Sequence, residues 1–183
     1  MNKLSWVLLA LGALGTNALT RDLHSLHIFD VTRESDGAAR FVGTWELVST
    51  EYTMKDGSKR PYPDVGKHGR GYLVYTSDGH MCAQLVNPDR PVWKDADHPT
   101  AAEKVASMDG LSAYCGRFAV DEVRHVMTHY PEIAWKPNFE GTTQPRPYAF
   151  ENDLLTFSDK EEEEPGALRY SIVWRRVATT ARN

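Results

Sequence analysis

The sequence predicts an all-β protein: an eight-stranded antiparallel barrel with one short helix. Three observations carry this prediction. Short segments rich in β-branched and aromatic residues recur along the chain, turn signals separate most of them, and only one segment has helical spacing. Many short alternating strands joined by hairpins are typical of closed antiparallel barrels. A barrel of this size either fills its interior with side chains or encloses one small ligand.

The first predicted strand spans residues 41–52 and begins with Gly43-Thr44-Trp45. Side chains alternate between the two faces of a strand, so Trp45, Leu47 and Glu51 are expected on one face. If Trp45 points inward near the closed base, Glu51 lies in the lumen toward the mouth. A buried carboxylate needs a partner, and Arg146, Arg90 and His129 are the candidates.

The other predicted strands span 71–76, 80–87, 114–120, 123–130, 148–150, 154–157 and 168–177. Ser77-Asp78-Gly79 predicts a tight hairpin, because Asp-Gly tolerates the positive φ angles that such turns require. On residues 114–120 the inward set is Tyr114, Gly116 and Phe118, and on 123–130 it is His125, Met127 and His129. If the last strand pairs with the first, the guanidinium of Arg176 can stack on Trp45.

Residues 100–111 have helical spacing, with Glu103 available for the first turn. This helix is short enough to serve as a lid or plug rather than a structural layer. Two long loops, one around Pro61–Gly66 and one over 131–147, are long enough to border the barrel mouth. The acidic run 160–164 is predicted to be a solvated hairpin tip.

The chain of 183 residues has a formal net charge of −4, with 25% charged residues. No basic patch points to nucleic acid or to an anionic membrane, so a neutral or weakly cationic partner is favoured.

Residues 1–18 have the organisation of a cleaved secretory signal, an uncleaved interfacial anchor being the alternative. The apolar stretch is too short for a membrane span, so we expect the mature protein to be secreted or to lie in the secretory-pathway lumen.

Residues 19–40 are predicted to be a flexible lead-in, 41–178 the barrel domain, and 179–183 a tail. Secretion would allow Cys82 and Cys115 to form a disulfide. Two free buried cysteines on neighbouring strands are an equal alternative.

His129 is the first catalytic candidate, as a general acid or base, because its ordinary pKa lies near neutrality. Arg146 or a tyrosine hydroxyl would stabilise a developing enolate or oxyanion, and Glu51 is a second acid or base. Structural readings compete with these: a core histidine that pins neighbouring loops, and an arginine that caps a loop carbonyl or pairs with a carboxylate. The residues predicted to contact a ligand are Tyr75, Tyr114, Trp93, Trp135 and Asn138.

Several reaction classes lack their motifs. The sequence has no Gly-x-Ser-x-Gly elbow, no phosphate-binding glycine loop and no dinucleotide fingerprint. Its histidines and cysteines lack the spacing of a metal site. Any chemistry is therefore predicted to need no cofactor or metal, which leaves proton transfers, isomerisations and ring closures.

Several motifs together resemble those of the lipocalin-like domain family, a bacterial and fungal branch of the calycin superfamily. They are, in order, Gly43-Thr44-Trp45-Glu46-Leu47-Val48-Ser49, Gly71-Tyr72-Leu73-Val74-Tyr75, Asp78-Gly79-His80-Met81, Gln84-Leu85, Arg90-Pro91, Tyr114-Cys115-Gly116, Thr128-His129, Pro137-Asn138-Phe139-Glu140-Gly141, Arg146 and Trp174-Arg175-Arg176-Val177. The resemblance implies an eight-stranded barrel with a ligand-holding calyx, often in secondary-metabolite pathways. Cys115, where an aromatic residue is common, and the leader depart from the family pattern.

Two functions follow from these observations. In the first, the barrel binds a small apolar, aromatic or polyketide-like molecule and acts as a cofactor-free isomerase or cyclase in secondary-metabolite biosynthesis. In the second, the protein is a secreted carrier that leaves a similar ligand unchanged. A ligandless interaction domain using the loop aromatics is less favoured, because it would need a flat exposed apolar patch.

Overall fold

The computed structural model describes residues 37–161 and 164–178 of the chain. The predicted secretory signal (1–18), most of the predicted lead-in (19–40) and the predicted tail (179–183) lie outside the described residues. Within the described part, no helix is both long and apolar enough to cross a membrane.

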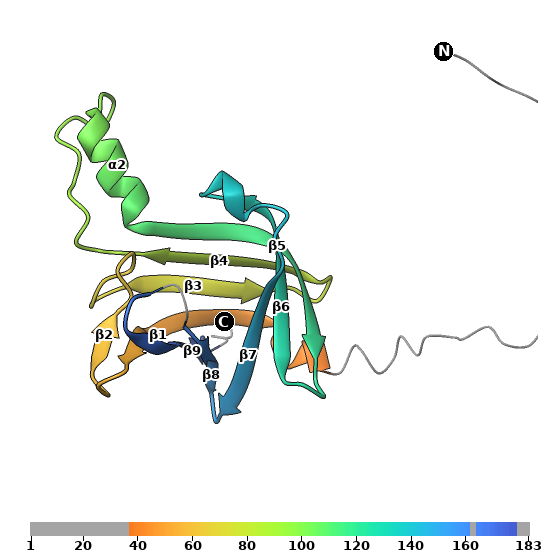
Figure 1. Ribbon diagram of the computed structural model, residues 1–183. Coiled ribbons are helices and arrows are strands. Elements are labelled where there is room, and N and C mark those ends of the chain that lie inside the picture. The colour runs from red at the N-terminus through yellow and green to blue at the C-terminus, as the bar shows by residue number, and fades with distance from the viewer. Residues whose placement is uncertain (1–36, 162–163, 179–183) are drawn as a thin grey trace, which may run out of the picture.

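The described residues form one antiparallel sheet closed into a barrel (Figure 1). Its elements are β1 Gly43–Met54, β2 Lys59–Pro61, β3 Arg70–Tyr75, β4 His80–Val86, α2 Ala101–Asp109, β5 Leu111–Asp121, β6 Val126–Ala134, the 3-10 helix η1 Pro137–Phe139, β7 Gln144–Glu151, β8 Leu154–Lys160 and β9 Ala167–Arg176. The sheet runs from β1 through β3 to β9, and β9 pairs again with β1 along its length. This closure confirms the predicted eight-stranded barrel; β2 is a short addition beside the end of β1.

A β-bulge in β1 changes which side chains enter the lumen. Leu47 pairs with Trp174 on β9, but Ser49 pairs with Val173, so Val48 is an extra residue on the β1 side. A one-residue shift moves every following side chain to the other face. Thr50 is therefore buried, whereas Glu51 lies on the outer face.

The prediction that Glu51 lies in the lumen is consequently wrong. Its carboxylate instead forms an ion pair with Lys59 of β2, which is the strand laid against this part of β1. Simple alternation from Trp45 gives the wrong face here because it takes no account of the bulge.

The hairpin between β5 and β6 also departs from the prediction. Residues 122–125 form the turn, and β6 begins at Val126 rather than at residue 123. His125 has a φ of 54° and is exposed in that turn, so its predicted inward placement is wrong. Met127 and His129 are buried as predicted, and Tyr114 and Gly116 of β5 are buried as well.

Aromatic rings close the base of the barrel. The Phe41 ring lies 4.9 Å from the rings of both Tyr148 and Phe150, and Trp45 is buried beside them. The guanidinium of Arg176 lies 4.1 Å from the centre of the Trp45 ring, which confirms the predicted stacking. Trp45 therefore forms the floor of the barrel, and any ligand space must lie toward the opposite end.

The helix α2 precedes β5 and projects beyond the start of that strand (Figure 1). A capping box begins it: the Thr100 hydroxyl accepts from the Glu103 backbone N–H, while the Glu103 carboxylate accepts from the Thr100 backbone N–H. No residue of α2 lines the barrel cavity described below. The predicted helix is thus present, but it does not serve as a plug.

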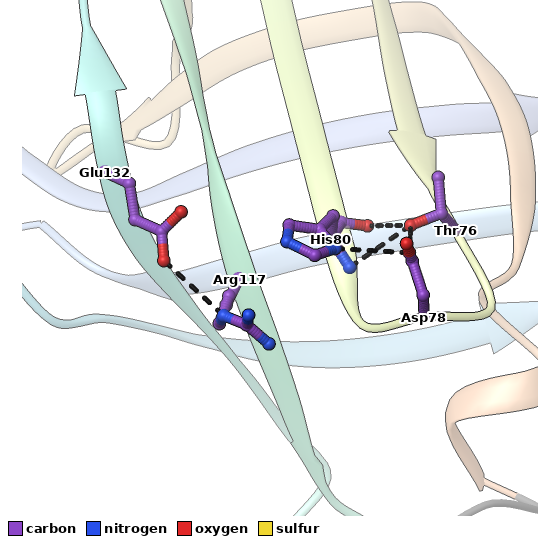
Figure 2. A network of polar contacts seen from close by, with 5 residues as sticks. All are labelled: Thr76, Asp78, His80, Arg117 and Glu132. Carbon is purple, nitrogen blue, oxygen red and sulfur yellow. Dashed lines mark hydrogen bonds and ion pairs between the residues drawn. The ribbon is translucent and has the colours of Figure 1, made fainter.

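The outer face of the barrel carries a disulfide between Cys82 of β4 and Cys115 of β5, which lie directly opposite each other in the ladder. Figure 2 shows polar contacts in the hairpin between β3 and β4 and between β5 and β6. Asp78 and Thr76 hold the predicted Asp78-Gly79 hairpin around His80, and Arg117 lies 3.5 Å from Glu132 on β6. These exposed contacts stabilise the hairpin and the outer surface, away from the lumen.

Candidate functional site

A cavity of about 620 Å³ occupies the barrel above the aromatic base. Apolar side chains, among them Leu73, Leu85 and Phe157, form much of its wall. Trp135, Asn138 and Phe139, in and beside η1, border it where the strands end. The cavity is large enough for a small organic molecule, since ligand sites commonly measure about 300 to 1,000 Å³.

His129 lies at the centre of a hydrogen-bonded cluster deep in this cavity. Its exposed fraction is 0%. Its Nε2 lies 2.6 Å from the Tyr75 hydroxyl, and its Nδ1 lies 2.8 Å from the Tyr114 hydroxyl. Arg146 donates from Nε to the same Nδ1 at 3.3 Å. Both ring nitrogens are thus engaged within the protein.

These contacts determine where the imidazole carries its proton. An arginine can only donate, so Nδ1 must accept, and the proton of the neutral ring lies on Nε2. Nε2–H then donates to the Tyr75 oxygen, while the Tyr114 hydroxyl donates to Nδ1. The result is a continuous chain of hydrogen bonds from Tyr114 through His129 to Tyr75.

Burial lowers the pKa of His129 well below its ordinary value of 6.5, and the positive charge of Arg146 lowers it further. Burial likewise raises the pKa of Tyr75 well above its ordinary range. At neutral pH His129 and Tyr75 are therefore uncharged, and Arg146 carries the charge of the cluster.

The structure brings together three of the residues predicted as the site: His129, Arg146 and Tyr114 all line the cavity. Trp135 and Asn138 line it as well. The remaining predicted residues lie elsewhere. Tyr75 is fully buried behind His129 and is not part of the cavity wall, and Glu51 is outside the barrel. Trp93 packs on α2, where its Nε1 donates to the Ser107 hydroxyl at 2.8 Å.

The polar residues of the cavity wall that sequence reasoning missed include Thr50, Tyr170 and Trp174. Tyr170 and Trp174 share one face of β9 with Ile172, so alternation along that strand could have identified them. Thr50 had no such signal, because its inward direction depends on the bulge in β1.

A family model described as a lipocalin-like domain matches residues 42–177. The chain belongs to this family. The match spans the whole barrel, from the start of β1 to the end of β9. Comparisons with curated proteins and with solved structures found no match.

A lipocalin-like barrel with an internal cavity is suited to binding a small molecule. Among the residues described here, no group of three or more His, Cys, Asp or Glu side chains is placed to hold a metal ion. The polar groups that a ligand meets in this lipocalin-like cavity include a guanidinium, tyrosine hydroxyls and a neutral imidazole. They can donate hydrogen bonds, stabilise negative charge and pass a proton along the hydrogen bonds that link Tyr114, His129 and Tyr75.

Proposed function

We propose that this lipocalin-like protein binds a small, partly apolar organic molecule and promotes its cofactor-free isomerisation or cyclisation. The observation that carries this proposal is the Tyr75–His129–Tyr114 chain joined to Arg146 on the cavity wall. A buried neutral imidazole between two hydroxyls, beside a cation, suits the transfer of one proton and the stabilisation of the anion formed. The pathway implied by the family is secondary-metabolite biosynthesis.

The proposed step removes one proton from the ligand and shifts two electron pairs within it. A C–H proton next to a ligand carbonyl passes to the Tyr114 oxygen as the Tyr114 proton passes to His129 Nδ1. The electron pair of the broken C–H bond forms a carbon–carbon double bond while the π pair of the carbonyl moves onto its oxygen, and the resulting enolate lies beside Arg146. Return of the proton to another atom of the ligand completes an isomerisation. Because the pKa of His129 is lowered by burial, the imidazolium gives its proton back readily.

A second function, a secreted carrier, is favoured by two other observations. The Cys82–Cys115 disulfide suits an oxidising compartment, such as the secretory-pathway lumen or the extracellular space. Both nitrogens of His129 already have protein partners, so the imidazole can serve to hold the wall of a passive binding site. In this function the ligand leaves the barrel chemically unchanged.

One experiment separates the two functions. The purified protein is incubated in D₂O with an extract of the organism that makes it, and small molecules are analysed by mass spectrometry. The enzyme is expected to incorporate deuterium into one compound or its isomer, and Tyr114→Phe is expected to lose this activity. A carrier retains a compound in native mass spectrometry without deuterium uptake. Absence of both retention and exchange would contradict both functions.

A further inference from the structure

Arg146 is a cation that lines the inside of the barrel. None of the ion pairs between described residues includes it. Its neighbours are instead His129 Nδ1 at 3.3 Å and the uncharged side chains of Tyr114 and Tyr170. Arg146 is half-buried, and a charge shielded from water without a counter-ion is costly, so an anionic ligand would gain more here than on the surface.

Carboxylates do line the same cavity, at Asp64, Asp159 and Glu161. Asp159 and Glu161 lie at the end of β8 and just beyond it, and Asp64 is in the loop after β2. They are therefore near the open end of the barrel, whereas Arg146 contacts the His129 cluster deeper inside. The net negative charge of the chain does not describe this deeper site, where the fixed charge is positive.

Two polar groups on the wall have no hydrogen-bond partner within the described part of the chain. Trp174 Nε1 and Thr50 Oγ1 are buried without one, although the exposed fractions of the two residues are only 2% and 8%. Both residues line the cavity, and they lie on paired strands, since Thr50 is opposite Ile172 on β9. Buried polar groups are nearly always satisfied, and an indole N–H can only donate. Both atoms have almost no accessible area in the barrel, so a ligand oxygen reaches Trp174 Nε1 only with a small movement of the wall, and it would then supply the missing acceptor.

We infer that the ligand carries an anionic oxygen, as a carboxylate or an enolate, that binds Arg146, and a second oxygen that accepts from Trp174 Nε1. This inference rests on the proposed binding function and names the class of molecule: a partly apolar organic acid or vinylogous acid. The apolar wall accommodates its carbon skeleton, and the two polar positions fix its orientation.

Two matched pairs of probes test the inference by isothermal titration calorimetry at pH 7.5. 2-Hydroxy-1,4-naphthoquinone, an enolate at this pH, is compared with neutral 2-methoxy-1,4-naphthoquinone. 2-Naphthoate is compared with neutral methyl 2-naphthoate. We expect at least one anion to bind about 10- to 100-fold more tightly than its neutral partner, because a charge-assisted hydrogen bond replaces an uncompensated cation. The pair that shows the preference identifies an enolate or a carboxylate.

Variants assign the preference to named residues. Arg146→Gln is expected to abolish it, while Arg146→Lys retains part of it. Arg124→Gln removes the same charge from a side chain that is 81% exposed at the far end of the barrel, and should leave the preference intact. Trp174→Phe, which removes the indole N–H together with the pyrrole part of the ring, should weaken both members of a preferred pair by at least about 3- to 10-fold.

Equal affinity of anion and neutral partner in both pairs would overturn the inference. A preference that survives Arg146→Gln would overturn the role of Arg146, provided circular dichroism shows a folded variant; Arg146→Lys is the second test if it does not fold. Binding of no probe would also overturn the inference. Deuterium uptake is measured separately, so the proposed function can stand or fail independently of this result.

Discussion

Arg176 and Trp45 join the last strand of the barrel to the first. The guanidinium stacks on the indole at 4.1 Å and donates to the backbone carbonyls of Val42, at 2.8 Å, and Arg40. Trp45 Nε1 in turn donates to the carbonyl of Phe41 at 2.8 Å. One side chain thereby fixes the segment that enters β1 against the end of β9, at the closed base.

Arg176→Ala should lower the free energy of unfolding by about 2 to 4 kcal/mol. The substitution removes a cation–π contact and two charge-assisted hydrogen bonds while leaving two carbonyls without partners. Urea unfolding followed by tryptophan fluorescence measures the loss. Arg175→Ala is the matched control, because Arg175 lies on the outer face in an exposed pair with Asp153 and should change stability by less than about 0.5 kcal/mol. Similar losses in the two variants would show that the base contact contributes nothing special.

The stability of the protein should fall as pH decreases through about 6.5. The imidazole of His129 is uncharged in the folded state because burial, together with Arg146, lowers its pKa. The unfolded chain binds a proton near the ordinary pKa of 6.5, so protons favour unfolding. The contribution is fully present above that pH and is lost by up to about 1.4 kcal/mol per pH unit below it.

Chemical unfolding at intervals between pH 7.5 and 5.0 measures this slope. His129→Gln should have a flatter profile than the wild type, and the difference between the two isolates His129 from the carboxylates. His98→Gln, which changes a histidine on the exposed surface, should keep the wild-type slope. Parallel profiles for the wild type and His129→Gln would contradict the neutral, buried state of His129.

Tyr75→Phe should destabilise the protein by about 1 to 3 kcal/mol, because it leaves His129 Nε2 buried without an acceptor. Ligand contacts should be unaffected, since Tyr75 lies behind the cavity wall. Urea unfolding and the probe titrations described above measure the two effects separately. A large loss of probe affinity with unchanged stability would instead place Tyr75 in contact with the ligand.

Reduction of the Cys82–Cys115 disulfide should lower the free energy of unfolding by about 2 to 4 kcal/mol, because the bridge links residues 33 apart in sequence. The Cys82→Ser, Cys115→Ser double variant should show the same loss without reductant. Wild-type protein treated with reductant and the double variant are compared by urea unfolding. Free thiols detected in protein purified under oxidising conditions would contradict the bridge.

The parts of this barrel that sequence patterns could predict are those that depend on local alternation. The pattern around Trp45 and in the last strand predicted the barrel floor and the stacking of Arg176 on Trp45. Alternation over residues 123–130 correctly predicted that the His129 side chain points inward. The failures arise where one extra or one turning residue changes the register. The bulge at Val48 turns the Glu51 side chain to the outer face. The turn between β5 and β6 includes His125, so β6 begins three residues later than predicted.

The candidate site was only partly predictable for a related reason. His129, Tyr114 and Arg146 stand out by residue type, and alternation indicated the inward direction of the first two. Whether they touch depends on how β5, β6 and β7 pair, which no local pattern contains. The disulfide could not be predicted from sequence for the same reason, because its two cysteines meet only through the register of β4 against β5.

Separate substitutions of Glu51, the predicted inward residue of β1, and Thr50, the observed one, test the bulge directly. Glu51→Gln should leave probe binding within about twofold of wild type, because its carboxylate lies outside the barrel and pairs with Lys59. Thr50→Val should change affinity by several-fold, since it removes a hydroxyl from the cavity wall while keeping the side-chain shape. Both variants are titrated with 2-hydroxy-1,4-naphthoquinone and 2-naphthoate, and circular dichroism checks that the barrel is intact. If Glu51→Gln changed affinity and Thr50→Val did not, the bulge at Val48 would be wrong and the lumen would contain the carboxylate.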